Sequence, residues 1–90
     1  MTEKKRIIVV FNSKTHAFRL ESLLDDEGYH SILYNAPGYL AKSCSMAIRI
    51  DERAYQFVLE KIRKSKLDVF KIYKLCYENN EKIYRVLKKY

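Results

Sequence analysis

The sequence predicts an α+β domain of the ferredoxin-like class, a βαββαβ sandwich whose antiparallel sheet carries two helices on one face. Three observations predict this class. Apolar runs with strand or helix periodicity follow one another in the order β-α-β-β-α-β between residues 6 and 75. The first run, residues 7–11, is apolar on both faces, as expected of a central, covered strand. The chain has 90 residues, which is the size of one small domain.

The first half of this unit is a strand, a helix and a second strand. Residues 6–11 form the first strand, and Ser13 can cap the helix that follows over residues 14–27. Gly28 stands just past the last periodic position, where helices commonly end. Residues 30–34 then form the second strand. The helix is amphipathic, and the side chains expected on its buried arc are Ala17, Leu20, Leu23 and Leu24.

The second half repeats the scheme after a loop over residues 35–44. Residues 46–50 alternate as a half-buried strand, and Asp51 can cap a helix over residues 52–66. Residues 68–75 close the unit as the fourth strand. In the third strand, one face carries Met46, Ile48 and Ile50 and the other carries Ala47 and Arg49. The buried stripe expected on the second helix is Ala54, Tyr55, Val58 and Ile62.

The last dozen residues follow the completed unit and predict an amphipathic helix over residues 78–90. We therefore divide the chain into a domain at residues 1–76 and a helical appendage at residues 77–90. Burial of the helix stripe is expected on the sheet or across a homodimer, because an apolar stripe is unfavourable in water. The side chains of that stripe are Ile83, Val86, Leu87 and Tyr90.

Composition excludes several classes of protein. The formal net charge is +7, which is compatible with a nucleic-acid partner. The basic residues are scattered, however, and no RNA-recognition signature is present, so no motif supports that partner. Two cysteines 32 positions apart do not form a disulfide framework and indicate reduced thiols in the cytoplasm. No segment is long and apolar enough to predict a signal peptide or a membrane span.

Cys44 lies in the segment that carries most of the functional information. It ends a loop that holds the only proline of the chain, and serines flank it on both sides. Hydroxyl groups, free backbone N–H groups and a nearby cation all stabilise a thiolate, so this position favours a reactive thiol. The alternative is a small residue at the start of a strand. The residues that we assign to binding around this thiol are Pro37, Gly38, Lys42, Ser43 and Ser45.

His16 is the second candidate for a functional residue. It falls within the apolar arc of the first helix, where a histidine is commonly half-buried and bonded to the backbone. The functional interpretation is a neighbour that stabilises the Cys44 thiolate or relays a proton. No Cys/His set has zinc-ligand spacing, and no phosphate loop, nucleophile elbow or paired-carboxylate motif is present. The sequence therefore predicts no metal and no cofactor, and it favours a carrier or binding domain over an enzyme.

Three motifs resemble the small family described as Putative Se/S carrier protein-like. Ser-x-x-His-Ala-x-x-x-Glu follows the first strand at residues 13–21, and a proline-containing loop ends in Ser-Cys at residues 43–44 before an alternating strand. Ile-Tyr-Lys stands in the last strand of the unit at residues 72–74. The resemblance covers residues 6–75. Two positions depart from it, because Gly38 replaces the arginine usual after the proline and Ser45 replaces the glycine after the cysteine.

The resemblance implies a sulfur or selenium carrier, or a thiol-based sensor, that acts through Cys44. The Cys44 thiolate would hold the chalcogen as a persulfide or perselenide, and a donor or acceptor protein would be its partner. The alternative function is a non-enzymatic module that binds a protein or an RNA through the sheet face, the terminal helix and the basic surface. A third is a regulatory domain that binds a ligand at the loop.

Overall fold

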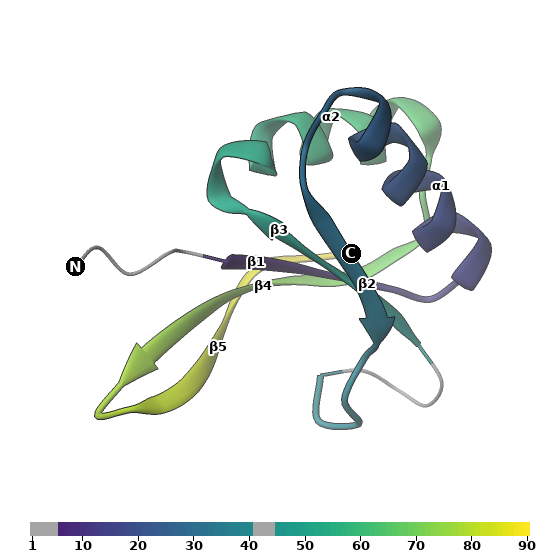
Figure 1. Ribbon diagram of the computed structural model, residues 1–90. Helices are drawn as coiled ribbons and strands as arrows, with labels where there is room; N and C mark the ends of the chain where they lie inside the picture. Colours follow the sequence, from purple (N-terminus) through teal and green to yellow (C-terminus); the bar gives the residue numbers. More distant parts are fainter. Residues whose placement is uncertain (1–5, 41–44) are drawn as a thin grey trace.

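The structure, a computed structural model, describes residues 6–40 and 45–90 (Figure 1). It is an α+β fold with one antiparallel sheet of five strands in the order β2-β3-β1-β4-β5. Helices α1 and α2 lie together on one face of this sheet. The strands are β1 (Arg6–Phe11), β2 (Ser31–Asn35), β3 (Met46–Asp51), β4 (Val69–Glu78) and β5 (Glu81–Lys89). The helices are α1 (Lys14–Asp26), the 3₁₀ turn η1 (Glu52–Ala54) and α2 (Tyr55–Ser65).

Strand β1 is central, as its apolar sequence predicts. It pairs with β3 on one side and with β4 on the other, and residues 7–11 are each at most 1% exposed. Ile7, Val9 and Phe11 pack in the core beneath the helices, whereas Ile8 and Val10 belong to a second apolar cluster. The sheet is thus covered on both faces along its middle strand, which is what a run of consecutive apolar residues requires.

Helix α1 begins and ends where the sequence indicates. The Ser13 side chain accepts a hydrogen bond from the backbone N–H of His16 at 3.4 Å, and Gly28 adopts a left-handed φ of 79° just after the helix. Ser13 thereby satisfies one of the first N–H groups of the helix. The helix buries Ala17, Leu20 and Leu24 against the sheet.

The expected cap at Asp51 is wrong. Asp51 makes no side-chain capping bond, and the chain passes through η1 before α2 begins. The carboxylate instead accepts a hydrogen bond from the Arg6 guanidinium at 2.6 Å, directly across the β1–β3 pair. An ion pair with a guanidinium competes successfully with a cap because the charged hydrogen bond is the stronger one.

The expected C-terminal helix is also wrong, because residues 78–90 are mostly strand. β4 continues to Glu78, the chain reverses at Asn79 and Asn80, and β5 returns antiparallel along β4. Both asparagines have positive φ, 50° and 66°, as a two-residue hairpin turn requires. The predicted helical appendage is therefore the fifth strand of the same sheet. The homodimer that the sequence predicted through this helix therefore loses its basis, because the segment is a strand.

The face of the sheet opposite the helices carries the second apolar cluster, and we call it the open face. The loop that follows β2 lies on this side of the sheet in Figure 1. Its residue Leu40 is only 3% exposed and packs in the cluster with residues from three strands. Those strand residues are Ile8, Val10, Ala47, Tyr73 and Leu75. The described part of the loop therefore covers apolar side chains that the helices leave open.

Candidate functional site

A pocket of about 260 Å³ lies on the open face, beside the loop. We call it the open-face pocket. Its apolar lining comes from Ile8, Ile32 and Leu75, together with Pro37 of the loop. Its polar lining is three tyrosines and two cationic side chains, namely Tyr34, Tyr39, Tyr84, Arg49 and Lys82. Parts of the chain that are far apart in sequence, including the loop and all five strands, thus meet around one small cavity.

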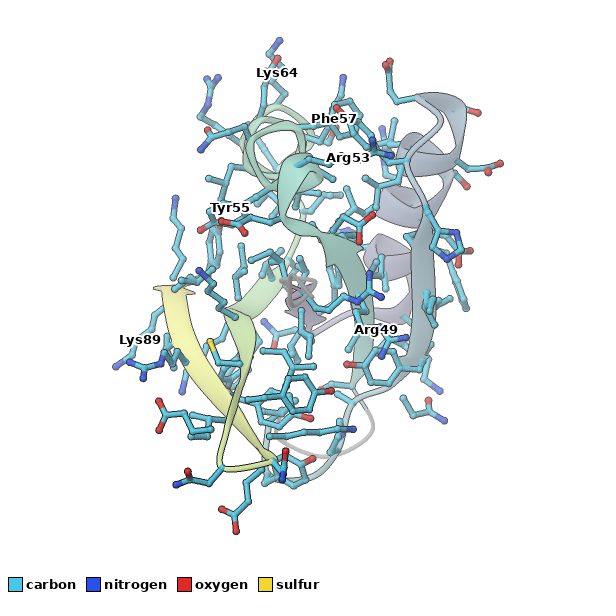
Figure 2. The ribbon with its side chains drawn as sticks, turned by 60° about the vertical axis from the view of Figure 1, so that its left-hand side comes forward. Arg49, Arg53, Tyr55, Phe57, Lys64 and Lys89 are labelled. Atoms are coloured by element: carbon cyan, nitrogen blue, oxygen red, sulfur yellow. The ribbon has the colours of Figure 1, made fainter. Side chains whose placement is uncertain are left out.

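The strand register explains why Arg49 points into this pocket. Arg49 in β3 is paired with Ile32 in β2 and with Ile8 in β1, so all three side chains project from the same face. Figure 2 shows Arg49 on β3, apart from Arg53 and Lys64 near α2. One residue earlier, Ile48 points into the helix-covered core. Alternation along β3 therefore delivers a half-buried cation to the middle of the open face.

Backbone and side-chain hydrogen bonds fix both ends of the described loop. The Tyr73 hydroxyl donates to the backbone oxygen of Leu40 at 3.0 Å, and the Leu40 N–H donates to the Pro37 oxygen at 2.9 Å. At the base, the Ala36 N–H donates to the Ser45 oxygen at 2.8 Å. The chain is therefore held against the open face at Leu40, and the two sides of the loop are bonded to each other at Ala36 and Ser45.

Three tyrosine rings form a connected cluster at this site. The ring of Tyr84 lies edge-on to Tyr73, with centroids 6.4 Å apart, and tilted against Tyr39 at 5.6 Å. The Tyr39 hydroxyl donates to the Tyr84 oxygen at 3.4 Å. Tyr39 is 73% exposed, so this contact with β5 is what holds its ring beside the pocket. Such aromatic pairs contribute beyond simple burial of area.

Burial raises the pKa of three phenols at this site, those of Tyr34, Tyr73 and Tyr84. Burial is the main cause that raises the pKa of Tyr84 to about 12. Burial also raises the pKa of Tyr34, although the positive charge of Arg49 opposes this, and burial raises the pKa of Tyr73. At neutral pH these hydroxyls are neutral and able to donate hydrogen bonds.

The pocket is positively charged. None of its lining residues is acidic. Within residues 6–40 and 45–90, the ion pairs engage Arg6, Lys64, Lys74 and Arg85 and include neither Arg49 nor Lys82. A half-buried guanidinium over an apolar floor, with no carboxylate beside it, creates a local field that attracts anions.

The residues that the sequence singled out are only partly described. Cys44, Lys42 and Ser43 lie outside the described residues. Of the others, Ser45 is buried and its backbone oxygen closes the base of the loop, while Pro37 lines the open-face pocket. Gly38 is exposed, and a Cβ atom added there meets no atom within 4 Å. The position can therefore accept a larger side chain.

His16 has a structural partner. Its Nδ1 accepts a hydrogen bond from the backbone N–H of Asp68 at 2.7 Å, which places the proton of a neutral ring on Nε2. The histidine follows the end of β1 at Phe11, and Phe11 pairs with Met46, the first residue of β3. His16 and the return of the loop into β3 therefore lie at the same end of the sheet.

Sequence reasoning missed the polar lining of the pocket. Arg49 was placed on the correct face by alternation, but nothing in the sequence indicated what would lie beside it. Tyr84 and Lys82 were assigned to a helix, which concealed their position next to the loop. The available signal was the Asn79-Asn80 turn, because two asparagines between apolar alternating runs favour a hairpin.

A larger cavity, about 700 Å³, lies between α2 and the end of β5, on the helix side of the sheet. Its rim carries Glu60 beside Arg63 and Lys88, so its charges are mixed. Among the described residues, no group of three or more His, Cys, Asp or Glu side chains could hold a metal ion. No helix of the described chain is long and apolar enough to cross a membrane. The open-face pocket is the stronger candidate site, because its charged lining residues are all cationic and the loop borders it.

Comparison with protein families gives one informative match. The family model described as Putative Se/S carrier protein-like matches residues 6–74, from β1 into β4. The match includes the loop and Arg49 and ends before β5. Neither the curated proteins nor the solved structures gave a match.

Proposed function

Because the chain belongs to the Putative Se/S carrier protein-like family, we propose that it carries sulfur or selenium on Cys44. The observation that carries the proposal is the family match over residues 6–74, which spans the cysteine loop. We further infer that the first four strands and two helices are a ferredoxin-like unit to which β5 is added. The element order and the central place of β1 support that inference. A carrier with reduced thiols belongs in the cytoplasm.

The transfer that we propose is a thiolate exchange. The Cys44 thiolate attacks the outer sulfur of a donor persulfide, R–S–SH, so that a new S–S bond forms on Cys44. The S–S bond of the donor breaks at the same time, and the donor leaves as the thiolate R–S⁻. No net oxidation occurs, because one sulfur–sulfur bond replaces another. An acceptor thiolate then takes the outer sulfur by the same exchange, and a perselenide follows the same course.

The neighbourhood of the loop supports this role. The loop is hydrogen-bonded to the open face at Leu40 and closed at its base by the Ala36–Ser45 bond, and the positively charged pocket is lined by Pro37. A positive field favours a thiolate over a thiol. Lys42, Ser43 and Ser45 are proposed to stabilise the same thiolate. His16 keeps Nε2 for a proton exchange with Cys44, since Asp68 occupies Nδ1.

Loading with a chemical persulfide tests the carrier function. The reduced protein is treated with glutathione persulfide, freed of reagent, and analysed by peptide mass. We expect one added sulfur atom on the Cys44 peptide, none in Cys44→Ser, and unchanged loading in the matched control Cys76→Ser. Cys76 is the suitable control because it is a half-buried free thiol in β4. Loading of Cys44→Ser at the level of the parent protein would refute the proposal.

A second candidate function is an interaction module for a protein or an RNA. The observation that favours it is the row of tyrosine and basic side chains on the open face, since aromatic rings and cations together bind single-stranded nucleic acid. Timed alkylation separates the two functions. The carrier requires Cys44 to react faster than Cys76 with iodoacetamide, whereas the module requires no such difference.

A further inference from the structure

We propose that the open-face pocket is a binding site for a small oxyanion, held by the Arg49 guanidinium and by tyrosine hydroxyls. The described residues that line the site come from the strands and from the loop before residue 41. The inference rests on the proposed function only for the identity of the anion. An oxyanion of sulfur or selenium, such as thiosulfate or selenite, is the form that a chalcogen carrier would meet.

The first argument is charge. Arg49 and Lys82 line a cavity without an acidic residue, and neither forms an ion pair within the described part of the chain. Other cations of the sheet are paired, such as Arg6 with Asp51 at 2.6 Å and Arg85 with Glu78 at 2.8 Å. A half-buried guanidinium that forms no ion pair with the described residues is suited to an external anion.

The second argument is the supply of hydrogen-bond donors. A guanidinium can only donate, and the phenols around it are neutral and carry their protons. Arg49, Tyr34 and Tyr84 line the same cavity. A guanidinium and phenol hydroxyls can all donate hydrogen bonds to a ligand whose surface consists of oxygen acceptors.

The third argument is size. A volume of about 260 Å³ corresponds to roughly nine waters at about 30 Å³ each. That volume holds a tetrahedral or pyramidal oxyanion with part of its hydration shell, and it is below the range usual for drug-sized ligands. The apolar floor of Ile8, Ile32 and Leu75 excludes water from one side and so strengthens the interaction with the guanidinium.

Anion titration of the Cys44→Ser protein tests the site without the carrier chemistry. Thiosulfate is added at low ionic strength, and binding is followed through backbone amide chemical shifts. We expect shifts at Ile8, Ile32 and Arg49, and weaker binding as sodium chloride is added. Arg49→Gln should weaken binding by at least about tenfold, because a charge-assisted hydrogen bond is lost. The matched control is Arg53→Gln, an exposed arginine outside the pocket, and it should bind as the parent does.

Three further measurements make the outcome decisive. Lys82→Gln, at an exposed position, should weaken binding by about two- to threefold even if Arg49→Gln fails to fold. Tyr84→Phe removes one donor and should also weaken it. Equal binding by Arg49→Gln and Arg53→Gln, or no shifts with thiosulfate, would overturn the inference. Shifts over the whole open face with a short RNA, but none with thiosulfate, would replace it with the interaction module.

The design separates this inference from the carrier proposal. Anion binding by Cys44→Ser together with absent sulfur loading of the parent would support the pocket and refute the carrier. Loading of Cys44 without any anion binding would do the reverse. Each result therefore decides one of the two statements by itself.

Discussion

His16 shows how one motif residue serves the fold. Ser13 caps α1 and accepts from the N–H of His16, the imidazole accepts from the N–H of Asp68, and Ala17 is buried against the sheet. The residues that resemble the family motif therefore join the start of α1 to the start of β4. Their spacing reflects helix geometry, in which positions three and four apart lie on the same face.

Replacing His16 by alanine should lower the free energy of unfolding by about 1 kcal/mol, because the Asp68 N–H loses its acceptor and turns to water. Urea unfolding measures the loss, and Thr15→Ala, an exposed neighbour in the same helix, is the control. A simultaneous fall in the alkylation rate of Cys44 would add a proton-relay role. Unchanged stability would contradict the hydrogen bond itself.

Tyr84 gives the protein a pH-dependent stability at alkaline pH. Its pKa of about 12 in the folded state exceeds the ordinary value of 10.0, and burial is the main cause. The folded protein therefore binds the phenolic proton more tightly than the unfolded chain does. The sign follows from linkage: this stability is complete below pH 10.0 and is lost as the pH rises towards about 12.

Tyr84→Phe should therefore reduce the loss of stability between pH 10.0 and about 12. A residual loss remains, because burial also raises the pKa of Tyr34 and Tyr73. Urea midpoints measured from neutral to alkaline pH provide the readout. Tyr77→Phe, which changes an exposed phenol, is the control. An alkaline profile identical to that of the parent would show that Tyr84 titrates normally.

At the scale of elements, local sequence predicted β1, α1 and β3 well because their signals agree. Ile7 to Phe11 form an apolar run, Ser13 and Gly28 mark the ends of α1, and β3 alternates. The prediction for the C-terminal segment was wrong because the spacing of its apolar residues fits a helix as well as a strand. These residues are Ile83, Val86 and Leu87. Pairing with β4 decided between them, and that pairing is a tertiary interaction that no local pattern contains.

The Asn79-Asn80 turn fixes the register of β4 and β5. Asn79 and Asn80 have φ values of 50° and 66°, a region that costs roughly 1–2 kcal/mol for a residue with an ordinary side chain. Asn80→Ala should therefore lower the unfolding free energy by about 1 kcal/mol, whereas Asn80→Gly should be neutral or stabilising. Chemical denaturation of the two variants gives the comparison. Equal stability of alanine and glycine would contradict the left-handed conformation.

At the scale of the molecule, the two faces of the sheet differ in what could be predicted. The helix-covered core follows from amphipathic patterns, since each apolar stripe needs an apolar partner. The open-face pocket does not, because Tyr34, Arg49 and Tyr84 come from three strands and Tyr39 from a loop. Only the strand order and the hairpin bring them together. From sequence alone, the residues of the open-face pocket therefore cannot be distinguished from ordinary core and surface residues.

The outer edge of the sheet determines the expected state of association. β5 is an edge strand with its hydrogen-bonding groups free on one side, and such an edge invites pairing with a second copy. It carries Lys82, Arg85, Lys88 and Lys89 against a single acidic residue, Glu81. Antiparallel self-pairing would place like charges opposite one another, which is destabilising.

We therefore expect a monomer at low ionic strength, although Val86 and Leu87 of β5, and Tyr90 just after it, are between 41% and 51% exposed. Repulsion between the basic edges opposes the apolar attraction, and salt screens that repulsion within about 10 Å at 0.1 M. Sedimentation equilibrium should give the mass of one chain in low salt and, at most, weak association at high salt. The double variant Lys82→Glu, Lys89→Glu should associate more readily, because the strand then carries Arg85 and Lys88 against three acidic side chains and its net positive charge is removed. A stable dimer of the parent at low salt would show that apolar contacts outweigh the charges.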